Sequence, residues 1–345
     1  LVSLGCESFN RFKLQKVIAE TGRPVETLVI QRTGGTKATI SAGREIVERQ
    51  LGVLQHQETV AMDVSELVIG TVCGGSDGTS GLTGNPAVGL AFDRLVEAGA
   101  SCIFEETGEL IGCEHHMAGR AVTPELGAEI IKAIDKAARY YGLLGQGSFA
   151  PGNAEGGLTT IEEKSLGAYA KAGTVPIDGM IKPGTRPPSG GLYLMDVVPD
   201  GELRFGYPNI NDNAEIVELI ASGCHIILFS TGRGSVVGSA ISPVIKVCAN
   251  PLTYRRMADD MDVNAGRILE EQAGIEDVGA EIVQLVERVA DGERTMSEAL
   301  GHREFILNYK TFEPVGPACL PMNRLATTVP FTQQGGESAP SATGQ

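Results

Sequence analysis

The chain has 345 residues, enough for roughly two domains with a sizeable buried core. It carries 28 Lys and Arg against 43 Asp and Glu, and its formal charge of −15 would repel phosphate backbones and anionic lipid surfaces. We therefore expect neither a nucleic-acid nor a membrane partner. The 45 glycines, in a chain with 42% hydrophobic residues, indicate many tight loops around an ordered core.

The cysteine pattern favours a reducing compartment. Seven cysteines are scattered along the chain without a Cys-x-x-Cys pair, which is typical of thiols that fill a core or bind a metal. No apolar run reaches the length of a membrane span, and the first residues do not resemble a signal peptide. We expect a cytoplasmic protein. Because the chain opens on what resembles the end of a buried strand, we also expect further sequence upstream.

The first half alternates between helical and strand-like periodicity. A glycine-rich segment follows the apolar run at 67–72, and Asn85 and Pro86 then predict the cap and first turn of a helix. The expected elements in chain order are helix 10–20, strand 27–30, helix 36–50, strand 67–72, helix 85–97, strand 100–104 and helix 123–141.

The second half repeats this alternation after two irregular stretches rich in glycine and proline, 142–151 and 182–191. We predict an α/β fold of mostly parallel sheets with flanking helices, in two Rossmann-like layers with glycine-rich loops at the carboxyl ends of strands. The expected elements are helix 161–171, strand 191–198, helix 213–221, strand 225–229 and a mostly helical region from 248 to 300. The predicted domains are 1–145 and 146–330, followed by a disordered tail at 331–345.

The first candidate site lies at residues 73–81, directly after a predicted buried strand. Glycines there let the backbone turn sharply and bring N–H groups toward an anion. The segment has neither the lysine of a P-loop nor the GxGxxG spacing, so neither nucleotide motif applies. A tight strand-to-helix turn is the structural alternative, but open α/β sheets place ligands at this end of their strands. The predicted site residues are Gly74, Gly75, Ser76, Asp77 and Thr79.

The second candidate site follows the next buried strand. Arg233 lies between Gly232 and Gly234, so the backbone can approach a ligand closely while the guanidinium offers two parallel hydrogen bonds to an anion. Pairing of Arg233 with a structural aspartate is the alternative. We predict a binding site for a small anion, to which Thr231 also contributes.

The third candidate segment is 151–165, where glycines precede a predicted helix. Thr160 and Glu163 have the spacing of a capping box, which alone could explain both residues. Lys164 could extend from the first turn into a pocket and act as a base or stabilise an enolate, although lone lysines are usually solvated.

The fourth candidate segment combines acids, a thiol and two imidazoles between residues 105 and 116. Such groups suit a metal or a proton-transfer site. Adjacent histidines on one helix point in different directions, so at most one of them, His116 in our prediction, belongs to the site.

In these segments the sequence resembles the altronate and galactarate dehydratases, a family of sugar-acid dehydratases that also includes sulfolactate sulfo-lyases. The resemblance extends in order from residue 1 to about 270, which is long enough to indicate the family more strongly than the substrate. The matching segments are 5–7, 73–81, 85–86, 104–112, 151–167, 231–234, 243–247 and 262–267.

The resemblance implies a lyase that removes the proton α to a carboxylate and expels a group from the β carbon. Arg233 would bind the substrate carboxylate, and Asp77 or Lys164 would move protons. Glu106 and Glu109 match acids of the family motif, and Glu106 is our catalytic candidate.

The resemblance also implies iron as cofactor, either as Fe²⁺ or in an iron–sulfur cluster. Cys6 and Cys73 match family cysteines, and the third family cysteine lies upstream of Leu1. We expect Cys6 and Cys73 to be metal ligands.

Segments 113–117, 182–184, 197–201 and 309–314 are similar to the sulfo-lyase branch of the family. That similarity implies release of sulfite from (2R)-3-sulfolactate, with His116 holding the sulfonate, a small partner subunit and an oligomeric assembly. A sugar-acid dehydratase is the first alternative. A non-catalytic anion-binding module is the second, because a fold by itself does not establish chemistry.

Overall fold

The computed structural model describes residues 1–7, 10–105, 107–144, 151–200 and 211–306. These residues belong to two compact units, one formed by Leu1–Val60 and the other by the described part of Ala61–Phe312. The first unit has a two-stranded parallel sheet and three helices, which are β1 (Val2–Ser3), β2 (Leu28–Val29), α1 (Arg11–Glu20), α2 (Ile30–Thr33) and α3 (Thr36–Leu54).

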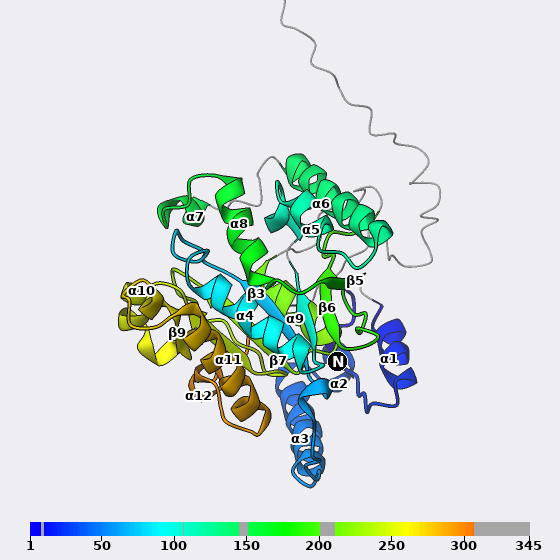
Figure 1. Ribbon diagram of the computed structural model, residues 1–345. Helices are drawn as coiled ribbons and strands as arrows, with labels where there is room; N and C mark the ends of the chain where they lie inside the picture. The colour runs from blue at the N-terminus through cyan, green and yellow to red at the C-terminus, as the bar shows by residue number, and fades with distance from the viewer. Residues whose placement is uncertain (8–9, 106, 145–150, 201–210, 307–345) are drawn as a thin grey trace, which may run out of the picture. The chain divides into compact units, whose positions relative to one another are not determined.

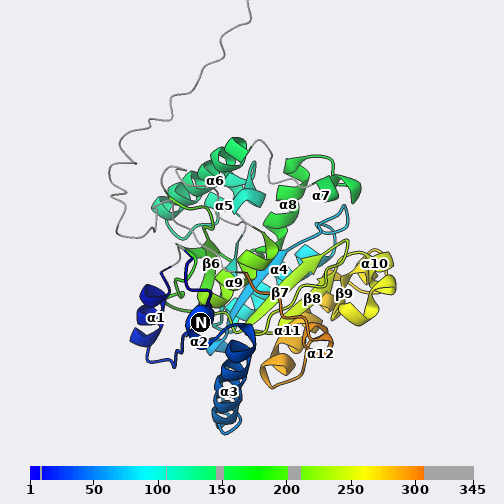
Figure 2. The same ribbon diagram turned by 180° about the vertical axis from the view of Figure 1, so that it is seen from behind.

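The second unit is built on a parallel seven-stranded sheet in the order β5-β6-β4-β3-β7-β8-β9. Figure 2 shows β7, β8 and β9 side by side in this order. The central strands β3 and β7 are mostly apolar and are buried along their whole length, because both faces of the sheet are covered. The strands are β3 (Val68–Cys73), β4 (Ser101–Phe104), β5 (Ile177–Ile181), β6 (Gly191–Met195), β7 (Ile226–Thr231), β8 (Val244–Cys248) and β9 (Val263–Asn264).

Alternate residues of the strands belong to two separate cores. Ile69 and Leu228 pack with α4 (Gly84–Glu97), α8 (Ile161–Lys171) and α11 (Ile275–Ala290), and Figure 1 shows α4 and α11 lying across this face. Val68 and Ile227 point the other way and pack with α9 (Asp212–Ala221). The remaining described elements are η1 (Val64–Glu66), η2 (Thr107–Leu110), α5 (Glu114–Ala118), α6 (Pro124–Leu144), α7 (Pro151–Glu155), α10 (Pro251–Arg256), η3 (Ala258–Asp260), η4 (Ala265–Ile268) and α12 (Met296–Leu300).

The predicted α/β class, with a parallel sheet and flanking helices, is confirmed. The two Rossmann-like layers stay a prediction, and the tail expected at 331–345 lies outside the described residues. Strands from both sides of position 145, the expected domain boundary, pair within the seven-stranded sheet. The prediction that Asn85 caps α4 is wrong, since the helix begins at Gly84 with Thr83 at its N-cap.

The sheet changes its winding direction between β3 and β7. From β3 the chain continues to β4 on one side, whereas from β7 it continues to β8 and β9 on the other. The segments that follow β3 and β7 therefore emerge side by side, and Gly74 N donates a hydrogen bond of 3.1 Å to Ser230 O. Ligands of open α/β sheets bind in the crevice at such a switch point.

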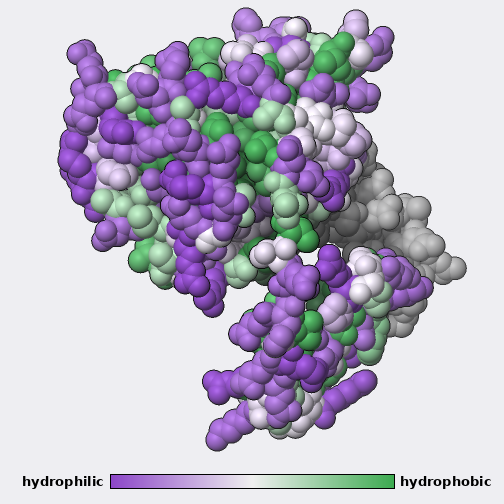
Figure 3. All heavy atoms as spheres, turned by 60° about the horizontal axis from the view of Figure 1, so that its bottom comes forward, coloured by the Kyte–Doolittle hydropathy of each residue, from purple (hydrophilic) through white to green (hydrophobic). Residues whose placement is uncertain are grey.

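Hydrophilic residues cover much of the face in Figure 3, with smaller hydrophobic patches between them. In the part of the chain that the structure describes, no helix combines the length and apolar character needed to cross a bilayer.

Candidate functional site

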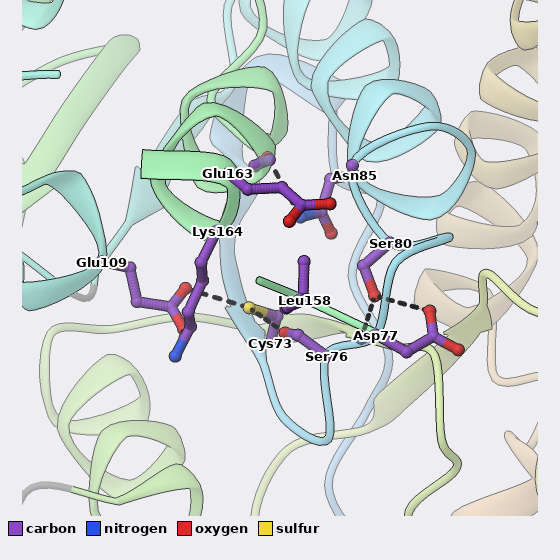
Figure 4. A pocket seen from close by; sticks show the side chains of 11 residues that line it. Cys73, Ser76, Asp77, Ser80, Asn85, Glu109, Leu158, Glu163 and Lys164 are labelled. Atoms are coloured by element: carbon purple, nitrogen blue, oxygen red, sulfur yellow. Dashed lines mark hydrogen bonds and ion pairs between the residues drawn. The ribbon is translucent and has the colours of Figure 1, made fainter. Parts of the chain in front are cut away.

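A polar pocket lies at the switch point, entirely within the second unit (Figure 4). It holds about 230 Å³ of space, part of which is the opening to solvent. The segment after β3, the helix α8 and the short helix η2 supply its wall. The lining residues are Cys73, Ser76, Asp77, Ser80, Gly81, Asn85, Glu109, Leu158, Glu163, Lys164 and Gly167.

A buried carboxylate shared by two lysines forms one side of the pocket. Lys164 Nζ lies 2.8 Å from Glu109 Oε1, and Lys171 Nζ lies 3.7 Å from Glu109 Oε2. All three side chains are buried, and Lys171 is only 1% exposed. Asn153 Oδ1 accepts a further hydrogen bond of 3.3 Å from Lys164. Such a buried cluster is stable only because opposite charges compensate one another.

The charges in this cluster shift the pKa values of the acids. Burial alone would raise the pKa of Glu109, but the ammonium groups of Lys164 and Lys171 outweigh it and hold that pKa at about 2. Asp212, in the first turn of α9, responds in the opposite direction. Burial and the negative charge of Glu109 raise the pKa of Asp212. Glu109 is therefore ionised throughout the physiological pH range.

The Cys73 thiol lies beside this ion pair, as Figure 4 shows. Its Sγ donates to Glu109 Oε2 at 3.0 Å and lies 3.4 Å from Ser76 Oγ. The thiol belongs to the last residue of β3, so the strand itself positions it. Cys73, Ser76, Glu109 and Lys164 thus form one continuous polar surface in the pocket.

Asp77 lies on the other side of the pocket and organises the segment after β3. Its Oδ1 accepts hydrogen bonds from Thr79 N at 2.8 Å and from Thr79 Oγ1 at 2.6 Å. Its Oδ2 accepts a bond of 2.9 Å from Asn250 Nδ2, at the start of α10. Segments that are distant in sequence therefore meet at this carboxylate.

Two glycines after β3 and β7 are required because carboxylates lie directly against their backbone. A Cβ on Gly232 would lie 2.1 Å from Asp77 Oδ1, and one on Gly74 would lie 2.0 Å from Asp212 Oδ2. Gly75 has a φ of +64° in addition. These residues therefore bring charged side chains against the backbone at the switch point.

Arg233 lies at the edge of this region with its side chain 41% exposed. Its Nη1 donates to Gly152 O at 2.5 Å and its Nη2 lies 3.1 Å from Glu155 Oε2. Its backbone N–H donates to Gly75 O at 2.8 Å, and Thr231 Oγ1 accepts a bond of 3.0 Å from Gly234 N. The arginine thus connects the segments after β3 and β7 to α7.

The structure brings many of the predicted site residues together. Cys73, Ser76, Asp77 and Lys164 line the pocket. Gly74, Gly75 and Thr79 belong to the same segment, and Gly232 and Arg233 contact it through the close approach and the hydrogen bond given above. Thr231 and Gly234 flank these two residues and are hydrogen-bonded to each other.

Some predicted residues have other surroundings or a second role. His116 is exposed on α5, with its ring 6.3 Å from that of Tyr169, and its role in binding stays a prediction. Cys6 belongs to the first unit and is exposed, and Gln31 Nε2 lies 3.5 Å from its Sγ. Glu106 lies outside the described residues. Glu163 lines the pocket and also caps α8, because its Oε2 accepts from Thr159 N at 2.8 Å.

Sequence reasoning missed several residues of the site. Lys171 could have been found from its spacing, since it follows Lys164 by two helical turns and lies on the same side of α8. Asn85 was assigned to a cap, but its Nδ2 donates to Gly167 O and its Oδ1 accepts from Ser230 Oγ. Asp212 carries no local signal, because the fold of the sheet brings it to Gly74.

The iron that the resemblance implies does not fit the second unit by itself. Within the described ranges, no group of three or more His, Cys, Asp or Glu side chains could hold a metal ion. Cys73 has a carboxylate neighbour in Glu109, but Lys164 and Lys171 already neutralise that carboxylate and would repel a cation. We therefore derive no reaction step through iron.

A polar pocket with a buried lysine–carboxylate pair, at the switch point of a parallel sheet, defines an α/β enzyme. The sequence model of the family "D-galactarate/Altronate dehydratase, C-terminal" matches residues 64–312. The chain belongs to the D-galactarate/altronate dehydratase family.

Curated relatives agree with this assignment. The chain is 36% identical over 319 residues to the (2R)-sulfolactate sulfo-lyase subunit beta of Chromohalobacter salexigens, a match that covers 89% of this chain and 77% of the relative. It is 34% identical to the galactarate dehydratase (L-threo-forming) of Escherichia coli, in a match that covers 87% of this chain and 57% of the dehydratase. It is 32% identical to the altronate dehydratase of Bacillus subtilis, in a match that covers 89% of this chain and 60% of that dehydratase. The chain thus spans less than two thirds of the length of both dehydratases.

Proposed function

We propose that the chain is a lyase that eliminates sulfite from (2R)-3-sulfolactate and leaves pyruvate. The observation that carries this proposal is the buried pair of Lys164 and Glu109 in a pocket of this family's fold. The similarity to a sulfo-lyase subunit over most of the chain supports the choice of leaving group.

The reaction has two requirements. The first is a base for the proton on C2 of the substrate, and the second is a cation for the negative charge that develops on the substrate carboxylate. A base takes the proton from C2 of the substrate, and the electron pair of that C–H bond forms the C2=C3 double bond as the C3–S bond breaks. Sulfite leaves with the electrons of the C–S bond, and the enol that remains tautomerises to pyruvate. Negative charge develops on the substrate carboxylate during proton removal, so a fixed cation there accelerates the step.

Lys164 meets the second requirement. Its Nζ is held in the pocket by Glu109 and Asn153. We assign it to the stabilisation of the developing enediolate. Ser76, at the other side of Cys73, offers a hydroxyl to the same ligand.

Asp77 is our candidate for the base. Among the residues that the structure describes, three carboxylates line the pocket, namely Asp77, Glu109 and Glu163. The pKa of Glu109 is lowered by the two lysines despite its burial, and the pKa of Glu163 is lowered by its hydrogen bonds from Thr159, so both are weak bases. Asp77 accepts hydrogen bonds in the pocket wall and is the remaining carboxylate of this described set.

Arg233 is our candidate for the second anionic group of the substrate. Its exposed guanidinium is held by a backbone carbonyl and by Glu155, and a substrate anion could replace that exposed carboxylate. A substrate with anions at both ends would then extend from Lys164 toward Arg233.

The first alternative is a sugar-acid dehydratase, in which the same proton removal expels water. The similarity to galactarate and altronate dehydratases supports it. The second is a non-catalytic anion-binding module. An assay that offers sulfolactate beside several aldonates and aldarates separates all three, because each outcome gives turnover of a different substrate or of none.

Three further expectations belong to this proposal. A small partner subunit is supported by the name of the sulfo-lyase relative, which is a subunit beta. A cytoplasmic location is supported by the free cysteines of the described residues. Iron follows from family resemblance, and metal and sulfide analysis of anaerobically purified protein measures it.

The decisive experiment compares the wild type with Lys164→Met in an anaerobic assay with added Fe²⁺. We expect sulfite release from sulfolactate by the wild type and a loss of about 100- to 1,000-fold in kcat for the variant. Release of water from an aldonate, with sulfolactate inert, would establish the dehydratase. A folded wild type without any lyase activity in complex with its partner would refute both.

A further inference from the structure

Lys171 carries a buried charge that has no role in the proposed reaction as described above. It lies at the end of α8 and is 1% exposed, and its Nζ is 3.7 Å from Glu109 Oε2. Lys164 lies two turns earlier on the same helix and reaches the other oxygen, Oε1, at 2.8 Å. A single carboxylate from η2 is therefore shared by two ammonium groups, of which only that of Lys164 lines the pocket.

The two lysines differ in whether a ligand in the pocket can pair with them: Lys164 lines the pocket, and Lys171 is not among the residues that line it. A substrate carboxylate in the pocket competes with Glu109 for Lys164, because both anions need the same ammonium group. If Glu109 had no other cation, its carboxylate would be left uncompensated in a buried place, which costs several kcal/mol. The ion pair with Lys171 on the opposite oxygen avoids that cost.

We propose that Lys171 is a positioning residue of the reaction, whose ammonium group holds the Glu109 carboxylate in place while Lys164 exchanges it for the substrate. The inference rests on the proposed function, since it assumes that Lys164 binds the reacting anion. It assigns to Lys171 a role that acts through Glu109 and not through contact with the substrate.

A purely structural role is the competing explanation, in which the ion pair only fastens α8 to η2. Both roles act through the Lys171–Glu109 pair, so in both of them the effect of Lys171→Met disappears once Glu109 is neutral. The roles differ in the constant that changes. If Lys171 compensates Glu109 while the substrate takes Lys164, its removal raises KM; if it only fastens the helix, its removal lowers the unfolding free energy and the active fraction and leaves KM unchanged.

The experiment measures kcat and KM for Lys171→Met, Lys171→Arg, Glu109→Gln and the double variant Glu109→Gln/Lys171→Met. Lys132→Met, at an exposed position of α6, is the matched control. We expect Lys171→Met to raise KM by about 10- to 100-fold with kcat changed by less than about 3-fold, because substrate binding then takes from Glu109 the other lysine that pairs with it. We expect Lys171→Arg to restore KM to within about 5-fold of the wild type, because arginine keeps the positive charge. The double variant should have the KM of Glu109→Gln.

Several results would overturn the proposal. One is a wild-type KM in Lys171→Met, and another is a double variant whose KM exceeds that of Glu109→Gln by the full Lys171→Met factor. If Lys171→Met does not fold, as judged by circular dichroism and thermal unfolding, Lys171→Gln replaces it in the same cycle. Failure of the wild type itself to release sulfite or water overturns the proposed function and the inference together, whereas an active wild type with an additive cycle overturns the inference alone.

Discussion

The ionised carboxylate of Glu109 should make the stability of the protein depend on pH in a defined way. Its pKa is about 2 in the folded protein against an ordinary value of 4.5. Because the pKa of the folded state is the lower one, the stabilisation is fully present above the unfolded pKa and is lost as the pH falls from about 4.5 toward 2. The difference corresponds to about 3 kcal/mol at neutral pH, of which roughly half is lost by about pH 3.5.

Urea unfolding at neutral pH and at about pH 3.5 measures this contribution. We expect Glu109→Gln to be less stable than the wild type by about 3 kcal/mol at neutral pH, since it leaves Lys164 and Lys171 without their counter-ion. The difference in unfolding free energy between the two proteins should shrink to roughly half at about pH 3.5. Glu129→Gln, on the exposed face of α6, is the control and should follow the wild type at both values. A gap that is the same at both pH values would contradict the assigned charge state.

Three further substitutions test the walls of the site. Gly232→Ala places a Cβ 2.1 Å from Asp77 Oδ1, so we expect a loss of about 1 to 3 kcal/mol in unfolding free energy, and unchanged stability would contradict the close approach. Arg233→Ala removes an exposed guanidinium, so KM should rise by about 10-fold while the unfolding free energy changes by less than about 1 kcal/mol; an unchanged KM would remove Arg233 from the binding site. Asn250→Ala removes both the cap of α10 and the hydrogen bond to Asp77, which should cost about 1 to 2 kcal/mol by thermal unfolding, and a fully stable variant would show that neither contact matters.

The segments after β3 and β7 could be predicted as sites because local rules govern them. Glycines, hydroxyls and an arginine directly follow buried strands, and parallel strands place such segments at one edge of a sheet. The bounds of α8 could also be predicted, since Thr160 at the cap and the apolar period define the helix. That these segments meet at Asp77 and Asn250 could not be predicted, because it depends on strand order.

The charged cluster was harder to infer for a different reason. Lys171 and Glu109 are separated by many residues. The helical spacing places Lys171 on the same side of α8 as Lys164, but no local pattern shows that this side meets Glu109 in a buried ion pair. Asn85 shows the converse problem. Its sequence context indicates a helix cap, yet its tertiary contacts with Gly167 and Ser230 determine its position.

The order of the strands also bears on how the protein is made. β3 and β7 are neighbours in the sheet, although Thr71 and its hydrogen-bond partner Leu228 are 157 positions apart. During synthesis the chain emerges from its N-terminus, so one edge of β3 lacks its partner until Ile226–Thr231 has left the ribosome. An apolar strand with an open edge is a template for aggregation. A product that ends before Ile226 would therefore carry an unprotected strand, and the chain depends on its later half to protect its earlier half.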